Sequence, residues 1–319
     1  MALLLREEDA RAVLTMANTI QVVEQAFIAL SQDQAINRTR IRMLEENGIM
    51  HLLAASIPTM GVMGYKTYTV FRSGMRYVVM LFSTLDGHLL AIIEADWLGT
   101  LRTGATSAIA TRYMANPDAA VVGLIGSGKQ AMAQLLGVRA VRSITTVNVY
   151  SRRLPECEEF CDQMARRLNI QVRPVASPRE AIEEADIVIT ATTSPTPVFP
   201  GDWLKPGCHI NAIGSNWANR HELDLPTLQR CDLVVTDSRE QAMLEAGDLI
   251  LPADEGLFDM NSIHELADVV AGKIAPRRSI GDITLYKGLG IALEDVAAAG
   301  LVYRLARERG LGTEINLLA

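Results

Sequence analysis

A glycine-rich segment directly follows an apolar run of the chain. Residues 120–125 (AVVGLI) form the apolar run, and residues 126–131 (GSGKQA) open a helical pattern. Glycines in this G-x-G-x-x-A spacing make a tight turn and let a pyrophosphate reach the free N–H groups of a helix N-terminus. The segment therefore predicts a dinucleotide site that includes Gly126, Ser127 and Gly128. A strand-to-helix turn that needs glycine only for its shape is the structural alternative.

The end of the second strand predicted after residue 119 bears on the choice between NAD and NADP. An NAD-selective site places an acidic side chain there to bind the ribose 2′-hydroxyl, but residues 144–154 contain no Asp or Glu. The strand ends instead in Ser151, Arg152 and Arg153. A guanidinium beside a hydroxyl suits a 2′-phosphate, so NADP(H) is favoured and NAD(H) is the alternative. Two solvated arginines at the start of a helix would give the same sequence.

Lysine is scarce in this chain, with 5 lysines among the 30 basic residues. Lys66 lies in the strand-like residues 64–71 (GYKTYTVF), where the period of two places it on the same face as Tyr68 and Val70. Burial would lower the pKa of its ammonium and let it exchange protons near neutral pH. A strand lysine is more often solvated, so the spacing alone leaves both interpretations open.

Arg102 precedes a run of small residues, 103–108 (TGATSA), at the predicted start of a helix. Arginine can hold a carboxylate with two hydrogen bonds, and small neighbours let a ligand or a backbone approach closely. The alternative is a surface arginine at a helix N-terminus. Arg38, Arg40 and Arg42 alternate on what we interpret as one strand face, where a solvated sheet edge is the simplest explanation.

The composition excludes several classes of protein. The net charge of −7 and the pI near 5.4 disfavour a nucleic-acid partner. Residues 1–5 are followed at once by REED, and no run of 18 apolar residues occurs, so neither a membrane anchor nor a secretory signal is predicted. Four cysteines in such a chain predict reduced thiols and a cytoplasmic protein. The histidines and cysteines match no metal-ligand spacing, and no metal is expected.

The length of 319 residues and the pattern of the chain predict two α/β domains. After residue 119, apolar runs alternate with helical stretches, which is typical of a doubly wound parallel sheet. Helix N-caps at residues 177–180 (SPRE) and 238–241 (SREQ) support this interpretation. The predicted strands are residues 120–125, 144–150, 171–175, 186–191, 208–213 and 232–236.

The first hundred residues lack this alternation and predict a second, α+β domain. An amphipathic helix over residues 13–30 precedes strand-like segments that include residues 65–71 and 77–86. The leucine spacing over residues 285–309 predicts a helix that returns to pack on this domain.

Five groups of segments, taken together, resemble the ornithine cyclodeaminase/mu-crystallin family. The resemblance covers nearly the whole chain, and residues 101–108 are its most specific element. The segments are residues 64–66 (GYK), 101–108 (LRTGATSA), 126–131 (GSGKQA), 213–216 with 222–224 (IGSN and ELD), and 282–287 with 294–295 (DITLYK and ED).

The resemblance implies a homodimer. It also implies that one of the two domains is built from two separate segments of the chain. Residues 1–112 with 288–319 would form the substrate-binding and dimerisation domain, and residues 113–287 the Rossmann domain. Lys66 matches the family's catalytic lysine, Arg102 the arginine that binds the substrate carboxylate, and Arg38 a further carboxylate contact. The positions where similar proteins touch the dinucleotide are Thr106, Lys129, Gln130, Thr192 and Gly214.

Two departures from the family pattern bear on the reaction. Asn216 stands where ornithine cyclodeaminases and archaeal alanine dehydrogenases have an aspartate, and an amide cannot act as a general base. His51, which we place among the substrate-binding residues, stands where cyclodeaminases carry a glutamate. Reduction of a preformed C=N bond needs only a hydride and one proton donor, here Lys66, while Asn216 would orient substrate or nicotinamide.

The expected activity is therefore the NAD(P)H-dependent reduction of an α-imino acid to the amino acid. A cyclic ketimine such as Δ1-pyrroline-2-carboxylate or Δ1-piperideine-2-carboxylate is the expected substrate. An amino-acid dehydrogenase or an ornithine cyclodeaminase is the enzymatic alternative. A non-catalytic protein that binds a dinucleotide and a small ligand, like mu-crystallin, is the second alternative.

Overall fold

The computed structural model describes residues 1–317 and consists of two compact units. The first unit comprises Met1–Ala105 and Gly290–Ala319, and the second comprises Thr106–Leu289. The first boundary falls inside helix α3 (Asp96–Met114). Both units combine helices with an eight-stranded sheet, as predicted for an α/β protein.

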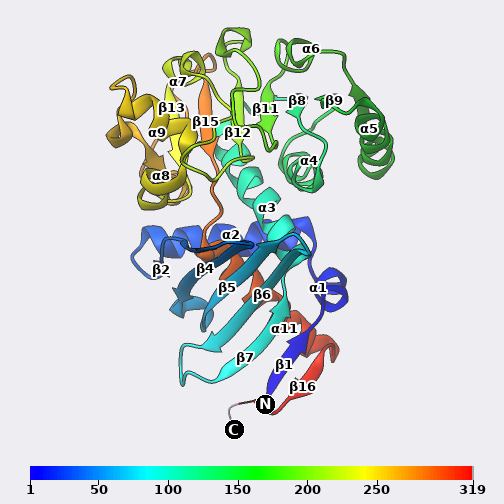
Figure 1. Cartoon of the computed structure of the whole chain (residues 1–319), viewed down its shortest axis with the longest axis vertical. Coiled ribbons are helices and arrows are strands. Elements are labelled where there is room, and N and C mark those ends of the chain that lie inside the picture. The colour runs from blue at the N-terminus through cyan, green and yellow to red at the C-terminus, as the bar shows by residue number, and fades with distance from the viewer. Residues whose placement is uncertain (318–319) are drawn as a thin grey trace. The chain divides into compact units, whose positions relative to one another are not determined.

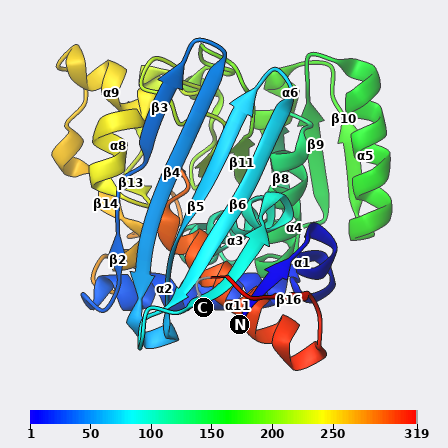
Figure 2. The same cartoon turned by 60° about the horizontal axis from the view of Figure 1, so that its bottom comes forward.

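The first unit contains a mostly antiparallel sheet in the order β16-β1-β7-β6-β5-β4-β2, with β3 also paired to β4. Among the described residues of this sheet, β1 and β7 are the one parallel pair. Figure 1 shows β4 to β7 side by side, and Figure 2 shows β4, β5 and β6 in the same order. The strands are β1 (Ala2–Leu5), β2 (Ile36–Asn37), β3 (Ile41–Glu45), β4 (Gly48–Ile57), β5 (Val62–Phe71), β6 (Gly74–Ser83), β7 (Leu89–Glu94) and β16 (Thr313–Ile315).

Helix α11 (Ala292–Arg309) covers one face of this sheet. Alternate residues of β4, from His51 to Ile57, are buried on that face. The alanines of α11 are small enough for the helix to lie close to the strands, and most of its first half is buried. Helices α1 (Glu7–Val13) and α2 (Met16–Ser31) and the 3-10 turn η1 (Pro58–Met60) complete the unit.

The second unit is a doubly wound parallel sheet in the order β10-β9-β8-β11-β12-β15-β13-β14, which confirms the predicted fold class. Apolar side chains are buried on both of its faces. The strands are β8 (Val121–Ile125), β9 (Thr146–Tyr150), β10 (Gln171–Pro174), β11 (Ile187–Thr190), β12 (His209–Ala212), β13 (Leu233–Thr236), β14 (His264–Glu265) and β15 (Thr284–Lys287).

The helices of the second unit connect these strands, and two of them begin at the predicted serine caps. The side chain of Ser177 accepts a hydrogen bond from the Glu180 N–H, and that of Ser238 from the Gln241 N–H. The helices are α4 (Lys129–Val141), α5 (Leu154–Leu168), α6 (Pro178–Ile182), α7 (Leu225–Arg230), α8 (Arg239–Glu245), α9 (Gly247–Asp254) and α10 (Leu266–Val270), with the 3-10 turns η2 (Gly201–Trp203) and η3 (Met260–Ser262).

All six strands predicted after residue 119 are present, each within two residues of its predicted bounds. The helix predicted over residues 285–309 is wrong in its first part, because residues 284–287 form β15 inside the sheet. Gly290, with a φ of +73°, then turns the chain before α11 begins. The helix predicted over residues 13–30 is α2, which begins only at Met16 after its cap Thr15, and Val13 is the last residue of the separate helix α1.

Neither a membrane-spanning helix nor a metal cluster is evident from the described part of the chain. Within residues 1–317, no single helix is long and apolar enough to cross a bilayer, although α1 and α2, bent by 90° at their junction, pass together by length and composition. Across the same residues, no group of three or more His, Cys, Asp or Glu side chains is arranged to hold a metal ion.

Candidate active site

Lys66 is buried in the first unit, where it forms an ion pair with a residue from the end of the chain. Its side chain projects from β5 on the face covered by α11, and the residue is 4% exposed. The Nζ atom lies 3.0 Å from Oδ1 of Asp295, in the first turn of α11. The alternative of a solvated strand lysine is therefore wrong.

Arg102 shares the carboxylate that pairs with Lys66. Its Nε lies 2.9 Å from the same Oδ1 of Asp295, and its Nη1 pairs with the neighbouring Glu294. The first turn of a helix favours negative charge, which suits two adjacent acids at this end of α11. A Cβ at Gly290 would lie 2.6 Å from Nη1 of Arg102, so only glycine leaves room for the guanidinium. Arg102 is 6% exposed and is not a surface arginine.

The electrostatic surroundings of Lys66 bring its pKa close to neutral. Burial lowers the pKa of Lys66 to about 8, the carboxylate of Asp295 partly opposes this change, and the charges of Arg102 and Arg40 add to it. The ammonium can therefore give up a proton near physiological pH.

Three aromatic rings form a row across β4, β5 and β6 beside Lys66. The register places His51 opposite Tyr68 and Tyr68 opposite Tyr77. The rings of His51 and Tyr68 stack with centroids 4.2 Å apart, and those of Tyr68 and Tyr77 are 5.3 Å apart. Lys66 Nζ lies 5.4 Å from the centroid of the Tyr68 ring. Burial, followed by the charges of Arg40, Arg42 and Lys66, lowers the pKa of His51 to about 4, so its imidazole is neutral at pH 7.

The three arginines near residue 40 occupy different environments, and the interpretation of one strand face is wrong. Strand β2 ends at Asn37 and β3 begins at Ile41, so residues 38–40 interrupt the predicted strand, although the Arg38 N–H still donates to the Ala54 carbonyl at 2.9 Å. Arg38 is exposed, whereas Arg40 is 9% exposed and donates from Nη2 to the Gly290 carbonyl at 2.8 Å. Arg42 lies opposite His51 in the register.

The glycine-rich loop of the second unit has the geometry that a pyrophosphate site needs. Gly126 has a φ of +112°, and a Cβ there would lie 2.5 Å from the Ala191 carbonyl oxygen. Gly128 is the N-cap of α4, and no heavy atom of the described chain lies within 4 Å of the position its Cβ would take. The turn places the N-terminus of α4 beside the ends of β8 and β11, the point where strand order reverses.

The residues predicted to select the dinucleotide follow β9, the strand next to β8. The Gly126 N–H donates to the Tyr150 carbonyl at 2.9 Å, so the two loops are adjacent. Ser151 is half-buried, and Arg152 is exposed. Arg153 is also exposed and pairs with Glu156 at 3.2 Å.

The other predicted dinucleotide contacts lie in the second unit as well. Thr192 follows β11, and Gly214 follows β12, so both stand at the carboxyl edge of the sheet. Thr106 is buried in α3. Lys129 is exposed and Gln130 half-buried in the first turn of α4. Asn216, two residues beyond Gly214, is half-buried.

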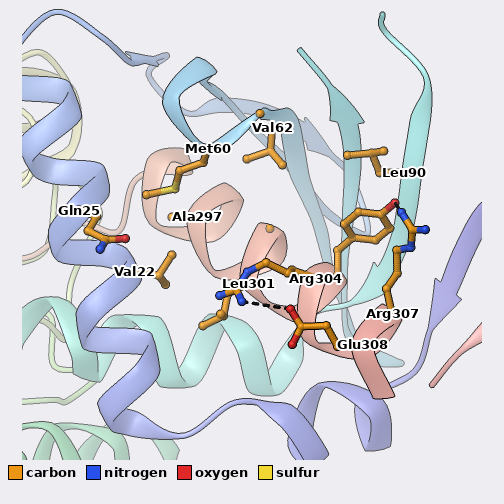
Figure 3. A pocket seen from close by; sticks show the side chains of 13 residues that line it. Val22, Gln25, Met60, Val62, Leu90, Ala297, Leu301, Arg304, Arg307 and Glu308 are labelled. Carbon is orange, nitrogen blue, oxygen red and sulfur yellow. Dashed lines mark hydrogen bonds and ion pairs between the residues drawn. The ribbon is translucent and has the colours of Figure 1, made fainter. Parts of the chain in front are cut away.

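A pocket of about 660 Å³ in the first unit lies among other residues. Val22 and Gln25 of α2 and Arg304 and Arg307 of α11 line it together with apolar residues of the sheet (Figure 3). No residue predicted for substrate or dinucleotide contact is among its lining residues. The buried charges of Lys66, Arg102 and Asp295, rather than this pocket, define the candidate active site.

Comparison with known proteins identifies the family. The model of the ornithine cyclodeaminase/mu-crystallin family matches residues 2–310. The chain belongs to this family. A Δ1-pyrroline-2-carboxylate reductase of Bacillus cereus is 33% identical over 324 residues, which cover 98% of this chain and 99% of that protein.

Two solved structures have the same fold as this chain. The Δ1-pyrroline-2-carboxylate reductase of Thermococcus litoralis, in complex with NADH and L-proline, is 35% identical with a TM-score of 0.94, covering 98% of this chain and 100% of that one. An archaeal alanine dehydrogenase dimer with bound NAD is 29% identical with a TM-score of 0.94, covering 99% of each chain.

Within this member of the ornithine cyclodeaminase/mu-crystallin family, sequence reasoning missed the acids that organise the site. Glu294 and Asp295 were named only as part of a segment that resembles the family, and no role was predicted for them. Two adjacent acids in a helix that is otherwise rich in alanine are the signal that could have found them. Arg40 was predicted to lie with Arg38 and Arg42 on a solvated edge. Its burial was missed because it depends on residues that are distant in the sequence.

Proposed function

We propose that this protein reduces an α-imino acid to the amino acid with a nicotinamide dinucleotide as hydride donor. The observation that carries the proposal is the buried Lys66, whose ammonium shares the Asp295 carboxylate with Arg102 and has a pKa of about 8. The similarity to Δ1-pyrroline-2-carboxylate reductases supports a cyclic ketimine such as Δ1-pyrroline-2-carboxylate or Δ1-piperideine-2-carboxylate as the substrate.

In the proposed reaction Lys66 is the proton donor. When bound, a nicotinamide dinucleotide would supply the hydride that reduces the imine carbon. Lys66 protonates the imine nitrogen and is left neutral until it takes a proton from solvent, and Asp295 keeps the ammonium charged before the reaction. Because the carbon–nitrogen double bond already exists, no base is needed to activate water or an amine. The half-buried amide of Asn216 orients the nicotinamide or the substrate by hydrogen bonds.

Positively charged groups around Lys66 favour a substrate carboxylate. Arg102 and Arg38 are the proposed carboxylate contacts, and the burial of Arg40 near Lys66 favours it as a further one. The neutral ring of His51, stacked on Tyr68, gives an apolar surface suited to a small ring. Substrate binding would then replace part of the pairing between Arg102 and Glu294.

The dinucleotide is proposed to bind the second unit, whose glycine loop fits a pyrophosphate. Gly126, Ser127, Gly128, Lys129 and Gln130 would hold the phosphates, and Thr106, Thr192 and Gly214 would contact the rest of the dinucleotide. The NADH and NAD held by the two solved relatives support NAD(H). Ser151, Arg152 and Arg153, without an acid at the strand end, favour NADP(H).

A homodimer is proposed from the face of the first sheet opposite α11. Many of its side chains are apolar and half-buried, and the rings of Tyr65 and Phe82, on neighbouring strands, stack with centroids 6.4 Å apart. Contiguous apolar faces of this kind mark protein interfaces, and the alanine dehydrogenase relative is a dimer. Light scattering should give about twice 34.8 kDa. The residues of this face include Met50, Leu52, Met63, Tyr65, Met80, Phe82 and Ile92.

The cytoplasm is the proposed location, because the four cysteines are all free thiols and three of them are buried.

The function is tested by the oxidation of NADPH and NADH by the purified protein with a panel of cyclic ketimines and acyclic imines. Oxidation with a cyclic ketimine is the expected result. Ornithine with NAD⁺ tests cyclodeaminase activity, and L-alanine with NAD⁺ tests an amino-acid dehydrogenase. Binding of dinucleotide without turnover of any imine would contradict the proposal and favour a non-catalytic binding protein.

A further inference from the structure

A buried carboxylate joins the ends of two neighbouring strands in the second unit. Glu222 is 0% exposed. Its Oε1 accepts hydrogen bonds from the Thr192 N–H at 2.7 Å and the Thr192 hydroxyl at 2.6 Å, and its Oε2 accepts from the Gly214 N–H at 2.8 Å and the Thr190 hydroxyl at 2.8 Å. One side chain therefore fixes the residues that follow both β11 and β12.

A second buried pair holds Glu222 and the same loop. Lys287, at the end of β15, lies with its Nζ 2.7 Å from Oδ2 of Asp248, and both side chains are 0% exposed. Asp248 Oδ1 accepts from the backbone N–H groups of Glu222 at 2.6 Å and Leu223 at 2.9 Å. Lys287 also donates to the Ser215 carbonyl at 2.7 Å. The two residues before Asn216 are therefore both held by hydrogen bonds, Gly214 through its N–H and Ser215 through its carbonyl.

The packing around this cluster, made of Glu222, Asp248 and Lys287, leaves the loop little freedom. A Cβ at Gly214 would lie 2.4 Å from Oε1 of Glu222 and 2.4 Å from the Thr192 carbonyl oxygen, so only glycine fits. A Cβ at Gly247 would lie 2.6 Å from the Trp217 carbonyl oxygen, just after Asn216. The loop is held from β11, β15 and the start of α9.

Stability alone does not explain three buried ionisable groups at this place. A buried ion pair is often no more stabilising than apolar residues of the same volume, and burial raises the pKa of Glu222 against the opposing charge of Lys287. What the cluster does provide is a fixed arrangement of Thr192, Gly214 and Asn216. These are the residues assigned above to the dinucleotide and to orientation of the reacting groups.

We propose that Glu222, Asp248 and Lys287 are positioning residues for hydride transfer, which fix Thr192, Gly214 and Asn216 at the carboxyl edge of the parallel sheet. The proposal rests on the proposed function, because it takes these three residues to contact the nicotinamide end of the dinucleotide. The cluster itself has no contact with reacting atoms and acts through the loop.

The amino ends of the strands, opposite the carboxyl ends that Glu222 joins, offer a matched control. Asp186, which precedes β11, accepts from the backbone N–H groups of Ala120 and Val121, both at 2.8 Å, and pairs with Lys205 at 2.6 Å. This is again a carboxylate that joins two strands and pairs with a lysine, but it lies at the amino ends of the strands. Asp186→Asn and Lys205→Met remove the same kinds of interaction away from Asn216.

The experiment compares Glu222→Gln and Lys287→Met with these controls by steady-state kinetics, NADH binding and the isotope effect of 4-deuterated NADH. In Glu222→Gln the amide oxygen can still accept from one of the backbone N–H groups of Thr192 and Gly214, but the amide NH2 turns a donor toward the other. We expect kcat to fall about 10²-fold, the usual effect of a displacement near 1 Å, while the Kd for NADH rises less than about tenfold. The isotope effect should increase, since hydride transfer becomes rate-limiting. The controls should lose thermal stability with an unchanged isotope effect.

If Glu222→Gln and Lys287→Met do not fold, the proposal is tested with Thr190→Val instead. This substitution removes one hydrogen bond to Glu222 with little change in the shape of the side chain. It should lower kcat by about threefold to tenfold and again raise the isotope effect. An unchanged kcat and isotope effect in folded variants, or equal losses in the controls, would overturn the proposal. A wild type that reduces no imine would refute the proposed function instead. In that case the positioning role is tested by the fluorescence emission of bound NADH. This emission should change in the Glu222 and Lys287 variants but not in the Asp186 and Lys205 controls.

Discussion

Replacing Asp295 by asparagine removes the negative charge that Lys66 and Arg102 share, and the structure gives the size of the effect. At the 3.0 Å separation of Lys66 Nζ and Asp295 Oδ1, an effective dielectric constant of about 20 gives an attraction of about 5.5 kcal/mol. At about 1.4 kcal/mol per unit, this limits the change in the pKa of Lys66 to about 4 units. The amide oxygen keeps a hydrogen bond, and we expect about half of that change.

The pKa of Lys66 should therefore fall from about 8 in the natural protein to about 6 in Asp295→Asn. Reduction requires the protonated ammonium, so activity is present below this pKa and is lost as the pH rises through it. At pH 7 the natural enzyme should keep most of its Lys66 protonated, whereas the variant should keep about a tenth, which predicts roughly a tenfold loss of kcat. The loss should be recovered near pH 5.5.

The assay is the pH dependence of kcat for ketimine reduction, measured below the melting temperature of each variant. Loss of a buried counterion costs about 3 to 5 kcal/mol, so thermal unfolding and dinucleotide binding must first show that Asp295→Asn is folded. Glu294→Gln is the matched control, because Glu294 is equally buried in the same helical turn and pairs with Arg102. It should alter the KM for the substrate and leave the pH midpoint near 8. A folded Asp295→Asn enzyme with its midpoint still near 8 would refute the reasoning.

Three further predictions concern the proton donor, the choice of dinucleotide and the type of reaction. Lys66→Met should bind dinucleotide normally but reduce its best ketimine 10²- to 10⁴-fold more slowly, the usual scale of general acid catalysis; near-normal turnover would remove Lys66 from the mechanism. Arg152→Ala combined with Arg153→Ala should lower the preference for NADPH over NADH by at least about tenfold in kcat/KM, the value of one charge-assisted contact, and a natural enzyme that already prefers NADH would contradict this assignment. Proline formation from ornithine should be absent or marginal and should increase in Asn216→Asp, while efficient proline formation by the natural enzyme would show that the base lies elsewhere.

The parallel sheet could be predicted because its signals are local. Strands β8, β11 and β13 are short runs of mostly apolar residues between turn residues, and serine caps mark two helix starts. Strand β15 was missed because Leu285, Leu289 and Leu293 have helical spacing by coincidence, and burial on both faces leaves a strand without alternation. Strand β1 was also not predicted, because it is only four residues long and precedes the first helix.

The candidate site was predictable only in part, because its burial is a long-range property. Periodicity placed Lys66 on a face with Tyr68, but not the helix that covers this face. The partner of Lys66 lies 229 residues further along the chain. No local pattern distinguishes the buried Arg40 from the exposed Arg38, since only the path of the chain between β2 and β3 separates them.

The division of the chain into units sets an order for synthesis on the ribosome. Residues 106–289 are continuous, so the second unit can fold as soon as it emerges. The first unit cannot, because the carboxylate of Asp295 is translated 193 residues after Arg102. Until then Lys66 and Arg102 lack the carboxylate of Asp295, and the sheet lacks helix α11, which covers Lys66. A chain that terminates before α11 would therefore carry a folded second unit beside an unfolded first one.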